Sequence, residues 1–136
     1  MGQQQLLLII LGVIVVGIAV AVGITMFTDN AISANRDAVT NDLVNLAARA
    51  QQFYRRPTAL GGGGNSFVGL TADAAGLRKL TNREQNANGT YSITTAGTAT
   101  GVVLQGVGTE VVDGTNNVTM EIHVSNTRSD SVVIVH

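Results

Sequence analysis

The sequence predicts an α+β protein, with a long N-terminal α-helix whose first half is apolar and whose second half packs against a roughly four-stranded antiparallel β-sheet. Three observations support this fold class. The residues from Leu6 to Phe27 are apolar except for three glycines and one threonine, those from Ile32 to Phe53 place apolar residues at helical spacing, and the last third of the chain alternates apolar with polar residues. At 136 residues the chain holds one modest domain plus the apolar segment, because domains typically hold about 100–150 residues.

The apolar segment is long enough to cross a bilayer. A run of about 20 apolar residues spans it as a helix at roughly 1.5 Å per residue, and the first charged residue here is Asp29. A secretory signal would have a basic start, a shorter apolar region and a small-residue cleavage site, whereas this segment starts with glutamines and is longer. Residues 1–28 are therefore either a permanent membrane anchor or a helix that leaves the membrane to be buried among copies of itself.

Three glycines, Gly12, Gly17 and Gly23, interrupt the apolar run. They lie five and six residues apart, so they do not form the GxxxG pairing face. One interpretation is that they permit close helix approach or local unwinding, since Gly costs about 1 kcal/mol relative to Ala inside a helix. The other is that they are ordinary glycines of a membrane span.

Beyond the apolar segment the helix becomes amphipathic, with one apolar and one polar face. This part of the helix is the start of the head, which we expect to comprise residues 29–136. Its apolar residues recur at steps of seven, four, three, four and three, the spacing of one helical stripe. Because proline disfavours helical geometry at the residue before it, and Pro57 is the first proline, we expect one helix from about Gln3 to about Arg55, with residues 29–56 amphipathic. The stripe consists of Ile32, Val39, Leu43, Leu46, Ala50 and Phe53.

A glycine-rich connector, residues 57–70, follows the helix. Its run from Gly61 to Gly64 is typical of a flexible linker and lacks the Lys-Ser/Thr ending of a phosphate-binding loop. A short helix over about 71–80, capped by Thr71, comes next. The residues expected to pin the connector onto the long helix are Phe67, Val68 and Leu70.

An antiparallel meander is expected over about residues 89–136. Its clearest strand runs from Val118 to Ser125, where strict alternation predicts one buried face and one wet face. Short turns on both sides of this strand favour antiparallel pairing. The helical stripe is the only long apolar surface that can cover the sheet. The sheet residues expected to face it are Tyr91, Ile93, Met120, Ile122 and Val124.

No catalytic, cofactor or metal site is expected, and the chain is not expected to be an enzyme. His123 lies on the wet face of the clearest strand, so a Ser-His-Asp arrangement would need chance geometry. Asp113, Asn116 and Asn117 could offer oxygen atoms to calcium, but turn formation explains all three better.

Charge and cysteine content exclude further classes of function. The net charge is −1 and no basic patch is evident, so nucleic acid is not an expected partner. Cysteine is absent, which removes disulfides, thiolate metal sites and a nucleophilic Cys.

A glutamine-rich start runs directly into the apolar helix in the sequence Met1-Gly2-Gln3-Gln4-Gln5-Leu6-Leu7-Leu8-Ile9-Ile10. A long amphipathic continuation, a glycine-rich connector and an antiparallel sheet follow. In this architecture the whole chain resembles the type IV pilin superfamily, and in sequence the resemblance extends to about Phe27.

The resemblance implies a precursor with a short basic leader, cleavage and often N-methylation by a prepilin peptidase, and an inner-membrane stage before a pilus assembly machinery acts. The partners it implies are identical subunits, whose apolar helices form the core of a helical filament outside the cell. The residues expected to pack in that core are Leu6, Leu7, Leu8, Ile9, Ile10, Leu11, Val13, Ile14, Val15, Val16, Ile18, Val20, Val22, Ile24 and Phe27.

The chain departs from the pilin pattern near its N-terminus. Pilins usually carry a glutamate at the fifth mature position, whose carboxylate is thought to pair with the N-terminal amine of a neighbouring subunit. Here Gln5 can accept a hydrogen bond from that amine but cannot neutralise it, and a buried unpaired ammonium is costly. Three interpretations stay open: the Met1 amine is deprotonated, the amides of Gln3, Gln4 and Gln5 together solvate it, or these amides simply sit at a polar boundary.

Two further pilin features are missing. The usual pair of C-terminal cysteines is absent, and so is the proline of the apolar helix. The candidates for a melted stretch in this helix are therefore Gly12, Gly17 and Gly23.

The expected function is that of a structural subunit of an extracellular type IV pilus-like filament (a fimbrium on the cell surface, with cell adhesion among its roles) that is membrane-embedded before assembly. The alternative is a pseudopilin or a single-pass membrane-anchored protein with a small β-rich binding head.

Overall fold

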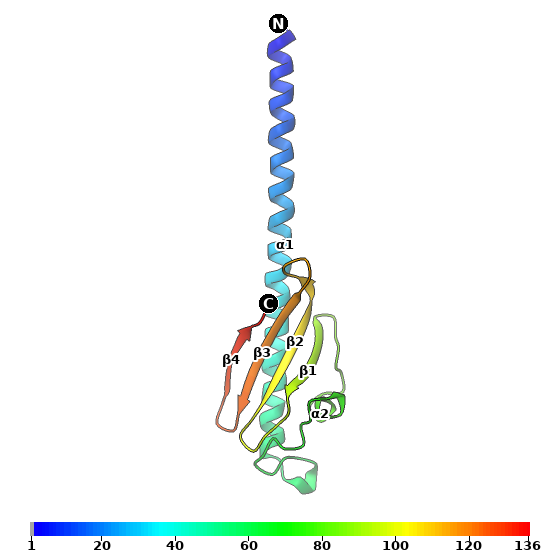
Figure 1. Ribbon diagram of the computed structural model, residues 1–136, viewed down its shortest axis with the longest axis vertical. Helices are drawn as coiled ribbons and strands as arrows, with labels where there is room; N and C mark the ends of the chain where they lie inside the picture. Colours follow the sequence, from blue (N-terminus) through cyan, green and yellow to red (C-terminus); the bar gives the residue numbers. More distant parts are fainter. Residues whose placement is uncertain (1) are drawn as a thin grey trace.

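The computed structural model describes residues 2–136, and its longest element is the helix α1 (Gly2–Arg55), which runs the length of the molecule (Figure 1). A 3₁₀ helix η1 (Thr58–Leu60) and the short helix α2 (Ala74–Arg78) follow. The strands β1 (Gly89–Thr95), β2 (Gly101–Val111), β3 (Asn117–Ser125) and β4 (Ser129–Ile134) form one antiparallel sheet in the order β1-β2-β3-β4. The second half of α1 packs against this sheet, so the predicted fold class is confirmed.

The glycine-rich connector closes the C-terminal end of α1. The backbone N–H groups of Gly63 and Asn65 donate to the carbonyl oxygens of Phe53 and Tyr54, at 2.8 and 2.7 Å. These carbonyls belong to the last turn of the helix and have no partner further along it. A Cβ atom on Gly63 would lie 1.8 Å from the carbonyl oxygen of Ser66, so only glycine fits there. The segment expected to be a flexible linker is an ordered cap.

Alternation along the strands makes the inner face of the sheet apolar. Tyr91 of β1 pairs with Gly106 of β2, and Gly106 pairs in turn with Met120 of β3. Met120 then pairs with Ile134 of β4. A Cβ atom on Gly106 would lie 2.7 Å from Cγ1 of Val39 and 2.9 Å from Cε1 of Tyr91. Helix and sheet can approach each other closely here because residue 106 has no side chain.

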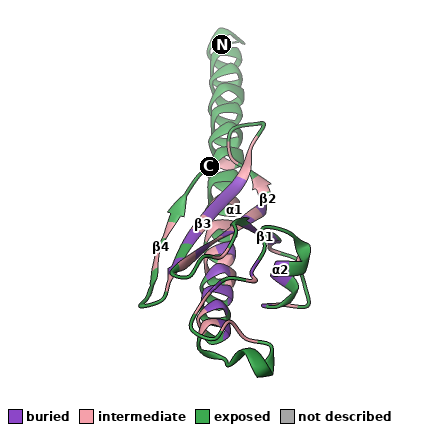
Figure 2. Cartoon of the chain, turned by 60° about the horizontal axis from the view of Figure 1, so that its bottom comes forward, coloured by how far each residue is buried: buried purple, intermediate pink, exposed green. Residues whose placement is uncertain are grey.

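The core lies between the second half of α1 and the sheet (Figure 2). Among the residues that the sequence assigned to the contact between helix and sheet, Ile32 is partly buried against this core. The others are buried, namely Val39, Leu43, Leu46, Ala50, Phe53, Tyr91, Ile93, Met120, Ile122 and Val124. The core also includes Ala47, Phe67, Leu70, Leu77, Leu80, Val102, Leu104 and Val118.

Two local predictions are wrong. Val68 is exposed instead of anchoring the connector, because the chain there turns its side chain to solvent while its neighbours Phe67 and Leu70 enter the core. The short helix is narrower than residues 71–80 and is capped by Asp73, whose carboxylate accepts the backbone N–H of Gly76 at 2.8 Å. Thr71 supports this cap by donating its hydroxyl to the same carboxylate.

Candidate functional surface

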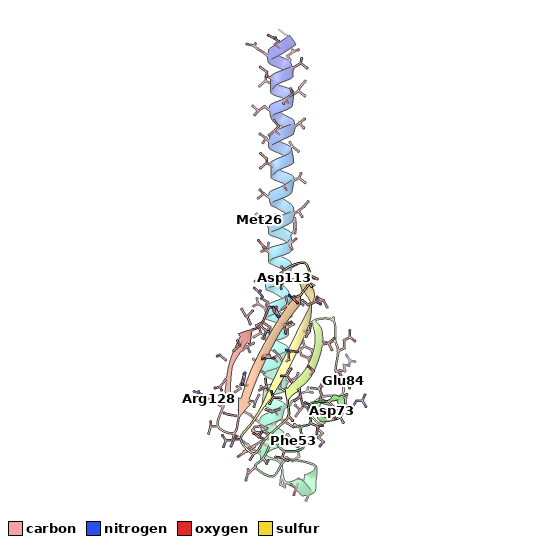
Figure 3. The ribbon with its side chains drawn as sticks, viewed as in Figure 1. Met26, Phe53, Asp73, Glu84, Asp113 and Arg128 are labelled. Atoms are coloured by element: carbon pink, nitrogen blue, oxygen red, sulfur yellow. The ribbon has the colours of Figure 1, made fainter. Side chains whose placement is uncertain are left out.

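The first half of α1 projects beyond the head, and no other described part of the chain packs on it (Figures 1 and 3). We call this half, residues 2–28, the overhang. Apart from the partly buried Gly23, its residues are all exposed; Leu11 is 56% exposed and Phe27 is 80% exposed. Soluble monomers rarely expose a contiguous apolar patch larger than a few hundred Å². A surface of this kind requires a covering.

All the residues expected to pack in a helical core lie on the overhang and are exposed in the single chain. They surround the helix instead of forming one stripe, so no single partner helix can cover them. They are Leu6, Leu7, Leu8, Ile9, Ile10, Leu11, Val13, Ile14, Val15, Val16, Ile18, Val20, Val22, Ile24 and Phe27.

The hydroxyl groups of the overhang are satisfied within the helix. Thr25 and Thr28 donate their hydroxyls to the carbonyl oxygens of Ala21 and Ile24, each at 3.1 Å. This bonding matters because an unsatisfied polar group placed in an apolar medium costs several kcal/mol, about 2–7 depending on the reference state. Up to Thr28, the overhang carries neither a charge nor an unpaired hydroxyl, and by length and composition it could cross a membrane.

The structure of the single chain shows where the glycines and the N-terminal amides lie, but it does not test the roles predicted for them. α1 is helical through Gly12, Gly17 and Gly23, and a Cβ atom at any of them would meet no other atom within 4 Å. Melting or close helix approach at these positions stays a prediction. Gln3, Gln4 and Gln5 lie exposed in the first helical turn, whereas Met1 is outside the described residues.

The turn between β2 and β3 engages the carboxylate of Asp113, one of the candidate calcium ligands. The carboxylate of Asp113 accepts the backbone N–H groups of Thr115 and Asn116, at 3.1 and 2.7 Å, and the side-chain amide of Asn116 at 2.8 Å. The backbone and side-chain bonds from Asn116, followed by the bond from Thr115, lower the pKa of Asp113 to about 2. Within residues 2–136, no group of three or more acidic or histidine side chains is placed to hold a metal ion.

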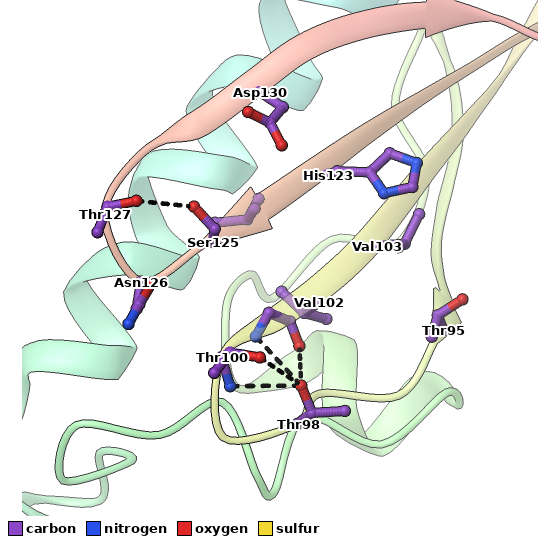
Figure 4. A pocket seen from close by; sticks show the side chains of 12 residues that line it. Thr95, Thr98, Thr100, Val102, Val103, His123, Ser125, Asn126, Thr127 and Asp130 are labelled. Carbon is purple, nitrogen blue, oxygen red and sulfur yellow. Dashed lines mark hydrogen bonds between the residues drawn. The ribbon is translucent and has the colours of Figure 1, made fainter.

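A hollow of about 400 Å³ lies at the end of the sheet far from the overhang (Figure 4). His123 and Asp130 line it from β3 and β4, together with several hydroxyl side chains. Most of those hydroxyls are engaged with the turns around them. The Thr98 hydroxyl, for example, accepts the backbone N–H groups of Thr100 and Gly101, at 3.3 and 3.2 Å. The hollow is therefore shaped by turn chemistry, and no nucleophile and base are paired in the part that the structure describes.

A cluster around Asp42 is the polar site that sequence reasoning missed. One carboxylate oxygen of Asp42 accepts the side-chain amides of Asn86 and Asn88, each at 2.9 Å, and the hydroxyl of Tyr91. The contacts join α1 to the loop before β1 and, through Tyr91, to β1 itself. Their partners are more than forty residues away in sequence, so helical periodicity alone gave no signal for them.

The same contacts shift two pKa values. Burial by itself would raise the pKa of Asp42, but hydrogen bonds from Asn88, Tyr91 and Asn86 lower it below its ordinary value of 3.8. Burial raises the pKa of the Tyr91 hydroxyl, and the bond to Asp42 raises it further. Asp42 thus stays ionised and Tyr91 protonated at neutral pH, which suits a structural lock between helix and loop.

The comparisons with known proteins do not assign the chain to a family. No family model, no curated protein and no solved structure matches it.

Proposed function

We propose that this chain is the structural subunit of an extracellular filament of the type IV pilus kind. The observation that carries the proposal is the overhang: an uncharged half-helix, apolar around its circumference from Leu6 to Phe27, joined without a break to a folded head. Such a half can reside in a bilayer and later be buried among the overhangs of identical subunits. The long helix and the antiparallel sheet are compatible with a pilin-like fold.

Once the filament extends into water, the burial of apolar side chains away from that water stabilises the assembly. Removing one subunit from the filament would expose its large apolar side chains at roughly 1.5–3 kcal/mol each, a sum on the order of tens of kcal/mol. Within lipid the hydrophobic effect gives little preference for a bundle, so packing and an assembly machinery have to drive the transfer out of the membrane. A filament also requires a contact between unlike surfaces that does not close on itself.

The second candidate is a membrane-anchored protein, in which the overhang stays in the bilayer and the head binds a ligand. The length and composition of α1 fit this candidate equally well. The two candidates differ in where the protein accumulates, because a filament subunit is released by shearing cells and an anchored protein is not.

The test is electron microscopy and intact-mass spectrometry of the material sheared from cells that make the chain. We expect thin helical filaments composed of this subunit. Leu11→Asp should abolish them because it places a charge in the middle of the overhang, whereas Ser92→Asp, on the exposed face of β1, should leave them intact. Protein found only in membranes, or normal filaments from Leu11→Asp, would contradict the proposal.

A further inference from the structure

The two ends of the head carry opposite charges. At the end beside the overhang lie the carboxylates of Asp29, at the start of the head, Glu110, near the end of β2, and Asp113, in the turn that follows. Arg36 is the cation on the same part of α1, and its buried Nε has no hydrogen-bond partner among residues 2–136. With Asp37, which follows Arg36 on α1, four carboxylates against one guanidinium make this the acidic end.

Cations gather at the other end, where α1 finishes. Arg49, Arg56 and Lys79 line one hollow of about 220 Å³ together with Gln52, Phe53 and Leu80. No carboxylate lines this hollow, and within residues 2–136 none of its three cations forms a salt bridge. We call it the cationic hollow.

Two of these cations are held in place by backbone carbonyls. Arg49 donates to the carbonyl oxygen of Leu80 at 3.1 Å, and Lys79 donates to the carbonyl oxygen of Gly69. These neutral partners orient the side chains without neutralising them. The nearby carboxylates are committed elsewhere: Glu84 pairs with Arg78 at 2.9 Å, and Asp73 caps α2.

We propose that the cationic hollow of one subunit receives the β2–β3 turn, with Asp113 at its start, from a second copy of this chain. The turn suits the hollow because it is exposed, lies at the opposite end of the head and carries an acid that is ionised at neutral pH. Asp113 keeps acceptor capacity beyond its bonds within the turn, since an ionised carboxylate offers about four lone-pair sites.

Exposed apolar residues lie at the same two ends and extend the contact. Leu60 and Val68 are 71% and 62% exposed in the connector, at the end with the hollow. Val111 and Ile134 are 44% and 56% exposed at the acidic end. The contact joins unlike surfaces and repeats in one direction, which is the geometry that an open filament needs. The inference rests on the proposed function and adds where successive heads touch.

The chain itself supplies a probe, because Lys79 is its only lysine. A carbodiimide joins a carboxylate to an amine only when the two are in direct contact. Within one head, Asp113 and α2 lie at different ends, so a Lys79–Asp113 cross-link must join two subunits (Figure 3). We expect sheared, unsubstituted filaments treated with carbodiimide to give a ladder of oligomers and a Lys79–Asp113 or Lys79–Glu110 peptide by mass spectrometry.

Charge variants test the contact without disturbing the turn. Asp113→Asn keeps an oxygen that can accept the N–H groups of the turn but removes the charge, so it should eliminate the Lys79–Asp113 peptide. Arg56→Glu should reduce the cross-linked fraction at least about tenfold, because it removes one cation of the hollow and places a like charge opposite Asp113. Lys79→Arg should abolish the ladder while filaments persist.

The possible failures are distinguishable. Filaments in which Lys79 is joined only to Asp73 or Glu84 of its own head, or to Glu121 on the middle of β3, would overturn this inference and leave the proposed function standing. Absence of filaments from the unsubstituted chain would overturn the proposed function and this inference with it.

Discussion

The two halves of α1 share one helix but have opposite surroundings. Leu43, in the half that the sheet covers, is 0% exposed, whereas Leu11, in the overhang, is 56% exposed. Both residues are ordinary helix formers, and the backbone hydrogen bonding is continuous between them. The helix itself therefore does not require burial at every position, and what distinguishes the halves is the partner that covers each of them. The head supplies that partner for the second half, and the overhang has none in the part of the chain that the structure describes.

The two halves should differ most in how much stability the head loses when a leucine is shortened to alanine. Leu43→Ala should lower the free energy of unfolding of the head by about 2–5 kcal/mol, because it leaves a cavity in the core. Leu11→Ala should leave that quantity unchanged in the detergent-solubilised subunit, since Leu11 contacts nothing in the head. Urea unfolding followed by tyrosine fluorescence measures both. Equal losses would mean that the overhang folds back onto the head.

Adding a methyl group to a glycine should lower stability in the head and raise helix stability in the overhang. Gly106→Ala should destabilise the head by about 1–3 kcal/mol, because the new Cβ atom collides with Val39 and Tyr91. Gly17→Ala has free space around it and should favour the helix by roughly 0.5–1 kcal/mol. Thermal unfolding measures the first effect and circular dichroism the second. Loss of filaments from Gly17→Ala despite a more stable helix would reveal close helix packing at that residue.

Acid should weaken the head but not the overhang. The folded pKa of Asp42 is lowered, so its contribution to stability is present above its ordinary pKa of 3.8 and is lost as the pH falls through the folded value. Asp42→Ala should cost about 1–3 kcal/mol at pH 7, because it leaves the Tyr91 hydroxyl and two amides without their acceptor.

The measurement is the free energy of unfolding from pH 7 down to pH 2. In Asp42→Ala, the free energy of unfolding should fall less steeply below about pH 4 than in the unsubstituted chain. The decline that remains is due to Asp73 and Asp113, whose pKa values are also lowered. Asp37→Ala, on the exposed face of the same helix, is the matched control and should keep the full decline. An unchanged profile in Asp42→Ala would remove this carboxylate from the account of acid sensitivity.

The smallest effect is expected at a surface ion pair of the head. Arg78 and Glu84 are 2.9 Å apart, but their side chains are 69% and 37% exposed. Arg78→Ala should therefore change stability by less than about 1 kcal/mol, and the change should shrink as salt is added. Unfolding at low and high ionic strength checks it. A larger loss would indicate that α2 depends on this pair for its position.

Local signals made the fold predictable. The uninterrupted apolar run, the seven-four-three spacing and the alternation in β3 each act over a few residues, and each is realised in the structure. Gly106 and the core residue Leu104 were harder to predict, because their strand β2 mixes glycine with apolar residues and its sequence shows no clean period.

Pairings between distant parts of the chain could not be predicted in the same way. The Asp42 cluster and the cationic hollow depend on side chains that fold into contact from separate segments, and the cap formed by the glycine-rich connector depends on backbone groups that do the same. The sequence position of Arg56, for example, indicates only a cation at the C-terminal end of the helix, where it interacts favourably with the helix dipole. Lys79 comes to lie beside it only because α2 folds back onto this end.

The unbroken backbone of α1 also has a mechanical consequence. In the filament that we propose, a pull on the head is transmitted along the hydrogen-bonded helix into the overhang without a hinge, because all 54 residues form one element. A pull parallel to that rod loads its buried side chains together instead of peeling them away one turn at a time. Such a shaft should resist tension much better than sideways prying, and subunits should be easiest to remove from its ends.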